Sequence, residues 1–274
     1  MNSPDGRSLL ISATFEALAR VENLVTPLSD EAWRLPTPCP GWTVADIVAH
    51  LTDLEATMNG QTRLTSEPDW EDFDYLTTDL SRLIEVGVQA RRNVSPPELL
   101  TEFHLVIAAR TTQLKADEHE LSDEVMGPLG TPTTFGRSLR MRTFDTWVHE
   151  QDIRTAIGEP GGWDGLPMDI SESVLLDSMP VVWGKKVKAP IGATLHLHLT
   201  DRDLDFQYRV DDDGRVRLCE FGDATVRLDV KWPDLVRRMC GRVAADSPEF
   251  RATITMTGDN DLGELLLREL TITP

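Results

Sequence analysis

The chain of 274 residues changes its hydrophobic period once, and this change limits the folds that it can adopt. Up to about residue 158, apolar residues recur at helical spacing, whereas from residue 193 onward they alternate with polar residues as they do in strands. A stretch rich in Gly and Pro, residues 157–167, separates the two patterns. The sequence therefore predicts a helical domain over residues 1–158 and an α+β domain over residues 167–274.

The first domain is expected to be a four-helix bundle with at least one long connection. Thr43 is the expected N-cap of the second helix, with Asp46 completing a shortened capping box. Ser95, followed by two prolines, is expected to start a later helix. Residues 129–136 are expected to form a loop. The predicted helices cover residues 9–25, 42–58, 70–92, 95–116 and 137–157.

The second domain is expected to be a smaller α+β domain with a mainly antiparallel sheet. Alternating apolar residues predict its strands, and a DDDG turn predicts a hairpin. The expected order is a strand at 193–201, a hairpin at 205–221, a strand at 224–230, a helix at 232–243, a strand at 251–259 and a helix at 261–270.

A formal net charge of −19 excludes some partners. We expect neither nucleic acid nor a membrane as a partner, because such an acidic surface repels phosphate backbones and anionic headgroups. The start of the sequence has no secretory pattern, and the three scattered cysteines predict no disulfide framework. A cytoplasmic protein, monomeric or homodimeric, is the simplest expectation.

Asp145 and His149 stand four residues apart in the last expected helix, so they differ by only about 40° around its axis. Such a pair can lie at the surface, form a buried hydrogen bond, or supply two ligands to a metal ion. A metal site needs a third donor, and His50 offers one, because it flanks the apolar stripe of its helix and can face a groove between helices. Taken alone, His50 has the alternative of a half-buried, hydrogen-bonded side chain.

Two imidazoles and a carboxylate make a three-ligand site with room for water or substrate, which is typical of catalytic zinc. Nickel, cobalt or iron accept the same donors. Asp152, near the same face, either orients a ligand or is an exposed helix carboxylate. Residue 153 is isoleucine, so residues 149–153 do not form the HExxH motif and a peptidase of that kind is excluded.

The remaining histidines and one cysteine have simpler interpretations. His196 and His198 share one face of a strand, where two histidines can bind a metal, but we expect them to be exposed polar residues. His104 is expected to be packed or hydrogen-bonded, and His119 lies in a charged, solvated stretch. Cys39, in the loop that precedes a helix N-terminus, is an alternative nucleophile because the helix dipole favours thiolate.

Two segments together resemble a known family. PTPCPGWTVADIVAHL, residues 36–51, resembles the signature of the mycothiol-dependent maleylpyruvate isomerase family. RTFDTWVHEQDIRTAIG, residues 142–158, resembles the final helix of the family's DinB-like four-helix bundle. Many members carry a carboxy-terminal domain similar to sterol carrier proteins, so the resemblance implies a DinB-like bundle over 1–158 and a sterol-carrier-like domain over 167–274.

The resemblance also implies roles for individual residues. The family's metal histidine of the second helix falls on His50, its acidic ligand on Asp145 and its last histidine on His149. Many members have glutamate at the position of Asp145, and the shorter side chain either coordinates from a closer helix or acts through water. The isomerase branch uses an arginine of the bundle, and Arg82 stands at a plausible distance along the chain for that catalytic role. The alternative for Arg82 is a solvated helix arginine.

A divalent metal with an open position binds a thiol and lowers its pKa, which produces a thiolate near neutral pH. The resemblance implies that the thiol is mycothiol, the low-molecular-weight thiol of actinobacteria. We therefore expect a metal-dependent mycothiol S-transferase whose metal-bound thiolate attacks an electrophilic small molecule, in detoxification or in natural-product thiol transfer. A mycothiol-dependent maleylpyruvate cis–trans isomerase is one alternative. A non-catalytic small-molecule-binding protein is the alternative of another class.

Overall fold

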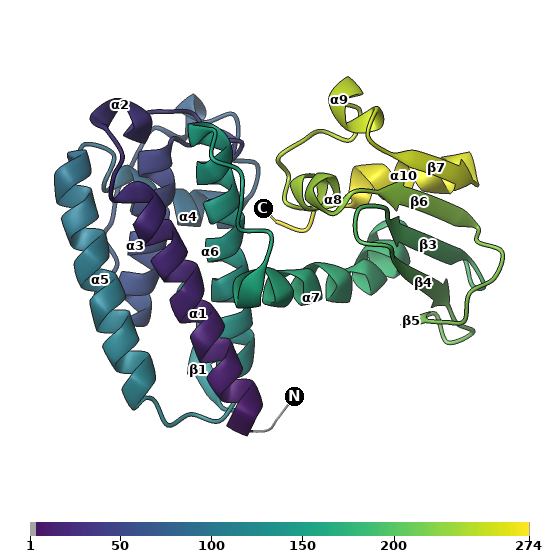
Figure 1. Cartoon of the computed structure of the whole chain (residues 1–274), viewed down its shortest axis with the longest axis horizontal. Helices are drawn as coiled ribbons and strands as arrows, with labels where there is room; N and C mark the ends of the chain where they lie inside the picture. Colours follow the sequence, from purple (N-terminus) through teal and green to yellow (C-terminus); the bar gives the residue numbers. More distant parts are fainter. Residues whose placement is uncertain (1–3, 274) are drawn as a thin grey trace. The chain divides into compact units, whose positions relative to one another are not determined.

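A computed structural model describes residues 4–273 of the chain. The chain forms two compact units, one up to Val174 and one from Leu175 onward. The first unit is a helical bundle and the second combines a sheet with helices (Figure 1), which confirms the predicted fold class. The division falls inside helix α7 (Gly165–Val181), beyond the Gly- and Pro-rich stretch at which the sequence places the boundary.

Four long helices form the bundle of the first unit: α1 (Pro4–Val25), α3 (Val44–Met58), α5 (Pro96–Ala116) and α6 (Phe135–Ile157). Helix α1 packs against α6, and α3 packs against α5 and contacts α6, so segments far apart in the sequence become neighbours (Figure 1). Shorter elements connect them: α2 (Asp30–Trp33), the 3-10 turn η1 (Trp70–Asp72), α4 (Asp79–Gln89), β1 (Glu124–Met126) and β2 (Pro132–Thr134).

The two predicted helix starts are confirmed. The Thr43 side chain accepts a hydrogen bond from the Asp46 backbone, and the Asp46 carboxylate accepts one from the Thr43 N–H at 2.9 Å. Ser95 begins α5 in the same way, since its N–H donates to Glu98 at 3.2 Å. Each cap satisfies N–H groups that a helix start leaves unpaired. In α3 the cap sets the start of the helix that carries His50.

Several segments differ from the sequence prediction, which also lacks the short helices Asp30–Trp33 and Pro248–Arg251. The helix expected over residues 70–92 is divided into η1 and α4, because Thr78 is extended and caps α4 through the N–H of Ser81. The loop expected over residues 129–136 contains β2, which pairs with β1. Helix α7 continues into a π-helical turn, Val182–Lys186, in a stretch where the hydrophobic pattern marks no element.

The second unit contains a five-stranded sheet in the order β5-β4-β3-β6-β7. Only the β3–β6 pair is parallel among these described strands, so the sheet is mainly antiparallel, as predicted. The three leucines of β3 are fully buried on one face, and its two histidines lie on the other. The elements are β3 (Thr194–Leu199), β4 (Leu204–Val210), β5 (Val216–Leu218), β6 (Val226–Val230), β7 (Thr255–Gly258), α8 (Trp232–Met239), α9 (Pro248–Arg251) and α10 (Asn260–Glu269).

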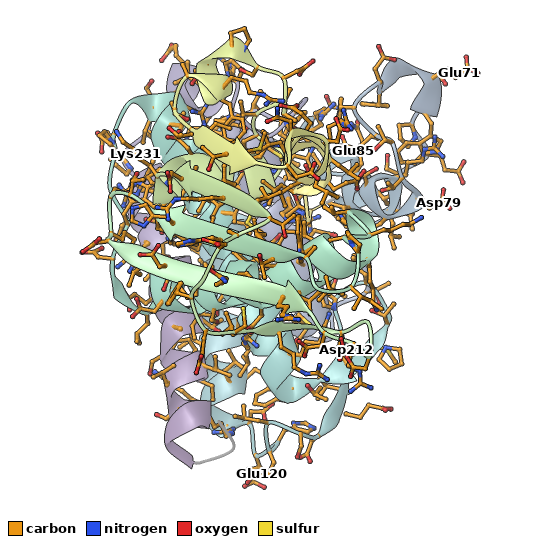
Figure 2. The ribbon with its side chains drawn as sticks, turned by 90° about the vertical axis from the view of Figure 1, so that its right-hand side faces the viewer. Glu71, Asp79, Glu85, Glu120, Asp212 and Lys231 are labelled. Carbon is orange, nitrogen blue, oxygen red and sulfur yellow. The ribbon has the colours of Figure 1, made fainter. Side chains whose placement is uncertain are left out.

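Part of the negative charge of the chain is carried at its surface. Glu71, Asp79, Glu120 and Asp212 are exposed and point outward in Figure 2. Within residues 4–273, every helix is too short or too polar to cross a bilayer.

Buried charges connect α3 to the turn that follows α4. Asp53 of α3 is 2% exposed and accepts hydrogen bonds from Arg91 Nη1 at 3.0 Å and from Arg63 Nε at 2.6 Å. Gly87 of α4 leaves room for this carboxylate, because a Cβ at residue 87 would lie 2.1 Å from Asp53 Oδ2. The close approach of the two helices therefore requires glycine at this position.

Gly87→Ala is expected to lower the free energy of unfolding by about 3 kcal/mol, because the added methyl group displaces a buried, doubly paired carboxylate. Gly222→Ala is the matched control, since no atom lies within 4 Å of its Cβ position, and its expected change stays within about 0.5 kcal/mol. Urea unfolding measures both variants. Equal midpoints for the two would contradict the close packing at Gly87.

Candidate metal centre

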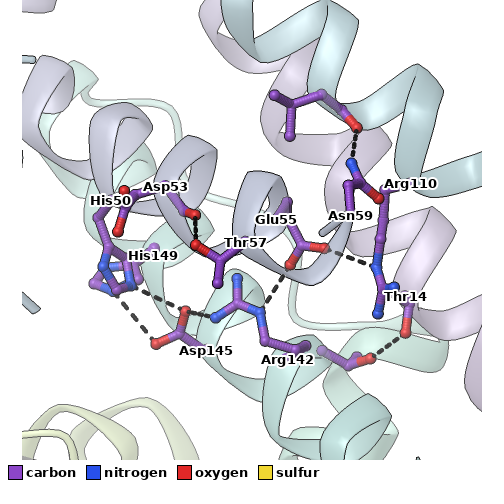
Figure 3. A network of polar contacts seen from close by, with 12 residues as sticks. Thr14, His50, Asp53, Glu55, Thr57, Asn59, Arg110, Arg142, Asp145 and His149 are labelled. Atoms are coloured by element: carbon purple, nitrogen blue, oxygen red, sulfur yellow. Dashed lines mark hydrogen bonds and ion pairs between the residues drawn. The ribbon is translucent and has the colours of Figure 1, made fainter. Parts of the chain in front are cut away.

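The structure brings His50, Asp145 and His149 together (Figure 3). His50 comes from α3, and the other two lie one turn apart on α6. His50 Nε2 is 3.1 Å from Asp145 Oδ2, and His149 Nε2 is 3.7 Å from Asp145 Oδ1. One donor atom from each residue lies within 4.8 Å of the other two. Two donors on one zinc ion lie roughly 3.4 Å apart, so small side-chain adjustments suffice for a shared ion.

The two imidazoles are buried and the carboxylate is partly open to solvent. The His50 and His149 side chains are 3% and 7% exposed, whereas that of Asp145 is 31% exposed. Asp145 is therefore the donor that solvent reaches most readily. A catalytic metal site needs such an open side, because one coordination position must remain for water or substrate.

The local charges favour the protonation states that metal ligands need. Burial lowers the pKa of His50, and Asp145 opposes this only in part, so the imidazole stays neutral. Burial would raise the pKa of Asp145, but the hydrogen bond with His50 and the positive charge of Arg142 hold it well below its ordinary value. A neutral imidazole and an ionised carboxylate are the forms that bind a metal, so the donor set fits a divalent ion.

Asp152 orients His149. Its Oδ2 lies 3.0 Å from His149 Nδ1, and the residue is only 3% exposed. The alternative of an exposed helix carboxylate is therefore wrong. A carboxylate oxygen accepts hydrogen bonds, so Nδ1 donates and Nε2 keeps its lone pair for the side on which Asp145 lies.

The indole ring of Trp42 packs against both imidazoles. Its ring centroid lies 5.0 Å from that of His50 and 5.6 Å from that of His149, with the latter ring inclined by 29°. The indole N–H donates to the fully buried Glu85 at 2.8 Å. The loop that precedes α3 thus supplies an aromatic side chain that covers the two rings and keeps water from them.

Arg142 is a neighbour of the centre that the sequence prediction missed. Its Nη1 donates to Asp145 Oδ2 at 2.7 Å, and its Nε donates to Glu55 Oε1 at 2.7 Å. Burial opposes the charge of Arg142, but Glu55 and Asp145 beside it raise its pKa. Its position three residues before Asp145, on the same helical face, was the available signal. The sequence spacing of Glu55 and of its second partner, Arg110, gives no comparable indication that they lie near the centre.

Cys39 lies on another side of His149. Its sulfur and one donor atom each from His149 and Asp152 lie within 4.8 Å of one another, and the side chain is half-buried. The three form a second group of potential ligands that shares His149 with the first. This position keeps Cys39 as the alternative nucleophile that its sequence context indicates.

Arg82 lies on the exposed side of α4. Its Nη1 is 3.6 Å from Asp79 Oδ1 on the same helix, and its side chain is 48% exposed. These contacts are those of a solvated helix arginine. His104 of α5 is 40% exposed and lies 3.4 Å from Thr26 Oγ1, as expected for a hydrogen-bonded histidine.

His196 and His198 differ from the sequence expectation. Both pair with Asp205 on the neighbouring strand, and their side chains are 13% and 21% exposed. They are half-buried members of a polar cluster, because the pairing of β3 with β4 brings Asp205 beside them. Within residues 4–273 they join no group of three potential metal ligands. His119 is half exposed beside Asp117, in agreement with the expected solvated stretch.

The fold and the donor set define a helical-bundle protein with a candidate metal centre and an appended α+β unit. A family model described as the mycothiol maleylpyruvate isomerase N-terminal domain matches residues 15–154. The chain belongs to this family.

Individual proteins are similar to the chain over different lengths. Two uncharacterized proteins of Mycobacterium tuberculosis, from strains CDC 1551 / Oshkosh and ATCC 25618 / H37Rv, are each 29% identical over 147 residues, which is 50% of this chain and 52% of theirs. The chain thus spans about half the length of the curated relatives that it matches.

Two crystal structures share the fold. They are of the mycothiol-dependent maleylpyruvate isomerase and of its histidine-to-alanine mutant, with TM-scores of 0.56 and 0.58 and identities of 15% and 14%. Each comparison covers 92% of both chains. The likeness therefore includes the second unit as well as the bundle.

Proposed function

We propose that this chain is a metal-dependent mycothiol S-transferase. The observation that supports it best is the convergence of His50, Asp145 and His149 from two helices, with the open side at Asp145. These three residues would hold a divalent metal, and two histidines with a carboxylate suit zinc. Membership of the mycothiol maleylpyruvate isomerase family supports mycothiol as the thiol.

When bound, the metal supplies Lewis acidity that lowers the pKa of a thiol and makes thiolate available near neutral pH. The residues of the chain prepare this site. Burial keeps His50 neutral, Asp152 orients His149, and Arg142 holds one oxygen of Asp145. Trp42 covers the ring faces. In the transfer, the sulfur of mycothiol forms a bond to an electrophilic carbon, the thiol proton is released, and the leaving group departs with its electron pair.

The fold likeness favours a second candidate function, a mycothiol-dependent maleylpyruvate cis–trans isomerase. In that reaction sulfur adds to the double bond, the adduct rotates about the resulting single bond, and the thiol leaves again. Isomerisation therefore regenerates mycothiol, whereas transfer consumes one thiol for each product. The substitution Arg82→Ala distinguishes the two reactions. It should lower the rate of isomerisation if this arginine is catalytic, and it should leave the rate of thiol transfer unchanged.

Thiol selectivity tests the proposal. The zinc-loaded protein is mixed with a generic electrophile, a dinitrophenyl halide, and with mycothiol, glutathione or bacillithiol in parallel. We expect mycothiol to react at least about tenfold faster than the other two, an energy difference of roughly 1.4 kcal/mol. A parallel reaction with maleylpyruvate and mycothiol follows the isomerisation. No rate above background with any of the three thiols on the electrophile, and none with mycothiol on maleylpyruvate, would favour the non-catalytic binding protein.

A further inference from the structure

A chain of buried charges runs from the candidate metal centre across the bundle (Figure 3). It starts at Asp145 and Arg142 on α6, continues to Glu55 on α3, and ends at Arg110 on α5, which pairs with Glu55 Oε2 at 3.1 Å. The side chains of Glu55, Arg110 and Arg142 are 0%, 2% and 4% exposed. Three helices thus contribute to a chain of alternating charge that connects Arg110 to a candidate ligand.

Burial makes each member of this chain dependent on its neighbours. A charge inside a protein is costly unless a partner of opposite sign compensates it. Glu55 stands between two guanidinium groups and compensates both. Without its negative charge, Arg110 and Arg142 would face each other as buried like charges.

The orientation of Arg142 decides how Asp145 is presented. Glu55 Oε1 holds Nε of Arg142, and this contact directs Nη1 to Oδ2 of Asp145. With Oδ2 held, the carboxylate cannot rotate freely, and Oδ1 stays on the side of His149 Nε2, 3.7 Å away. A guanidinium is planar and rigid, so fixing one nitrogen fixes the direction of the others.

We propose that Glu55 is a positioning residue of the metal centre, which acts through Arg142 on the ligand Asp145. Glu55 would have two roles: it would set the rotation of the Asp145 carboxylate, and it would neutralise the guanidinium next to a bound divalent cation. The inference rests on the proposed function only in requiring that His50, Asp145 and His149 bind a metal.

Zinc affinity of the full chain tests this role, measured by competition with a chromogenic chelator. Glu55→Gln keeps the shape of the side chain and removes its charge, and we expect zinc to bind about ten- to a hundredfold more weakly. Asp53→Asn is the matched control, because Asp53 is also a buried carboxylate of α3 that pairs with arginines, Arg91 and Arg63. Its zinc affinity is expected to stay within about threefold of the unsubstituted protein.

A second pair of variants tests the same role in case the Glu55→Gln protein folds poorly. Arg142→Lys keeps the charge but has one ammonium in place of a fork, so it cannot hold Glu55 and Asp145 in the same geometry. We expect it to weaken zinc binding, while Arg91→Lys does not. The visible spectrum of the cobalt-loaded protein should change in Glu55→Gln and Arg142→Lys and remain constant in the two controls, since it reports ligand geometry.

The outcomes separate the two proposals. Unsubstituted protein that binds no zinc would overturn the metal assignment and this inference together. Zinc binding that is equally strong in Glu55→Gln and the unsubstituted protein, or equally weakened in Glu55→Gln and Asp53→Asn, would overturn the inference alone.

Discussion

His149→Ala is expected to weaken zinc binding by at least about a hundredfold and to remove thiol transfer, because the substitution deletes one of three ligands. The His149 side chain contacts three other residues of the centre. Its Nε2 is 3.7 Å from Asp145 Oδ1, its Nδ1 is held by Asp152 at 3.0 Å, and its ring lies against Trp42. Elemental analysis and chelator competition measure the loss of metal.

His104→Ala is the control for this substitution. His104 is also a helical histidine of the bundle, but its side chain is 40% exposed and contacts Glu22 and Thr26. We expect it to retain zinc and activity. The assignment of the ligands would be wrong if metal stayed bound at full stoichiometry after both His50→Ala and His149→Ala.

Removal of the metal is expected to destabilise the first unit as well as to stop the reaction. A metal that binds only the folded state, present at about a hundred times its dissociation constant, adds roughly 2.7 kcal/mol to the free energy of unfolding. For a unit of this size such a change corresponds to about 5–10 °C in the unfolding midpoint. Chelated protein should therefore unfold at a lower temperature, and added zinc should restore both stability and thiol transfer.

The His149→Ala protein provides the internal reference for this measurement. Its midpoint should not change with zinc, because one ligand is missing. A chelated protein that keeps full activity and an unchanged midpoint would show that the reaction needs no ion at this site, and Cys39 would then become the nucleophile to test by Cys39→Ala.

Local signals predicted the helix starts well. The Thr43–Asp46 capping box and the Ser95 start are formed as the sequence indicates, since both depend on residues within one turn. Over residues 70–92 the prediction was wrong, because the hydrophobic pattern suggested one continuous helix. Thr78 and Ser81 form their own cap there, and the helix begins anew.

Sequence spacing also predicted which residues of the candidate centre face the same way. Asp145 and His149 share a helix face because of their four-residue separation, and the resemblance added His50 from a distant segment. Sequence spacing did not predict the contacts that surround these three residues. Trp42 covers both rings only because the loop before α3 lies beside α6 in the folded chain.

The sequence by itself determined the two-part architecture, the helix caps and the three candidate donors, because periodicity and spacing act within a few residues and the family motifs are contiguous. Only the tertiary structure decided that Glu55, Arg110 and Arg142 form one buried chain ending at Asp145, and that Arg82 faces solvent beside Asp79. A buried charge finds its partner through the packing of helices, and that packing depends on the shape and burial of the whole bundle rather than on any single segment.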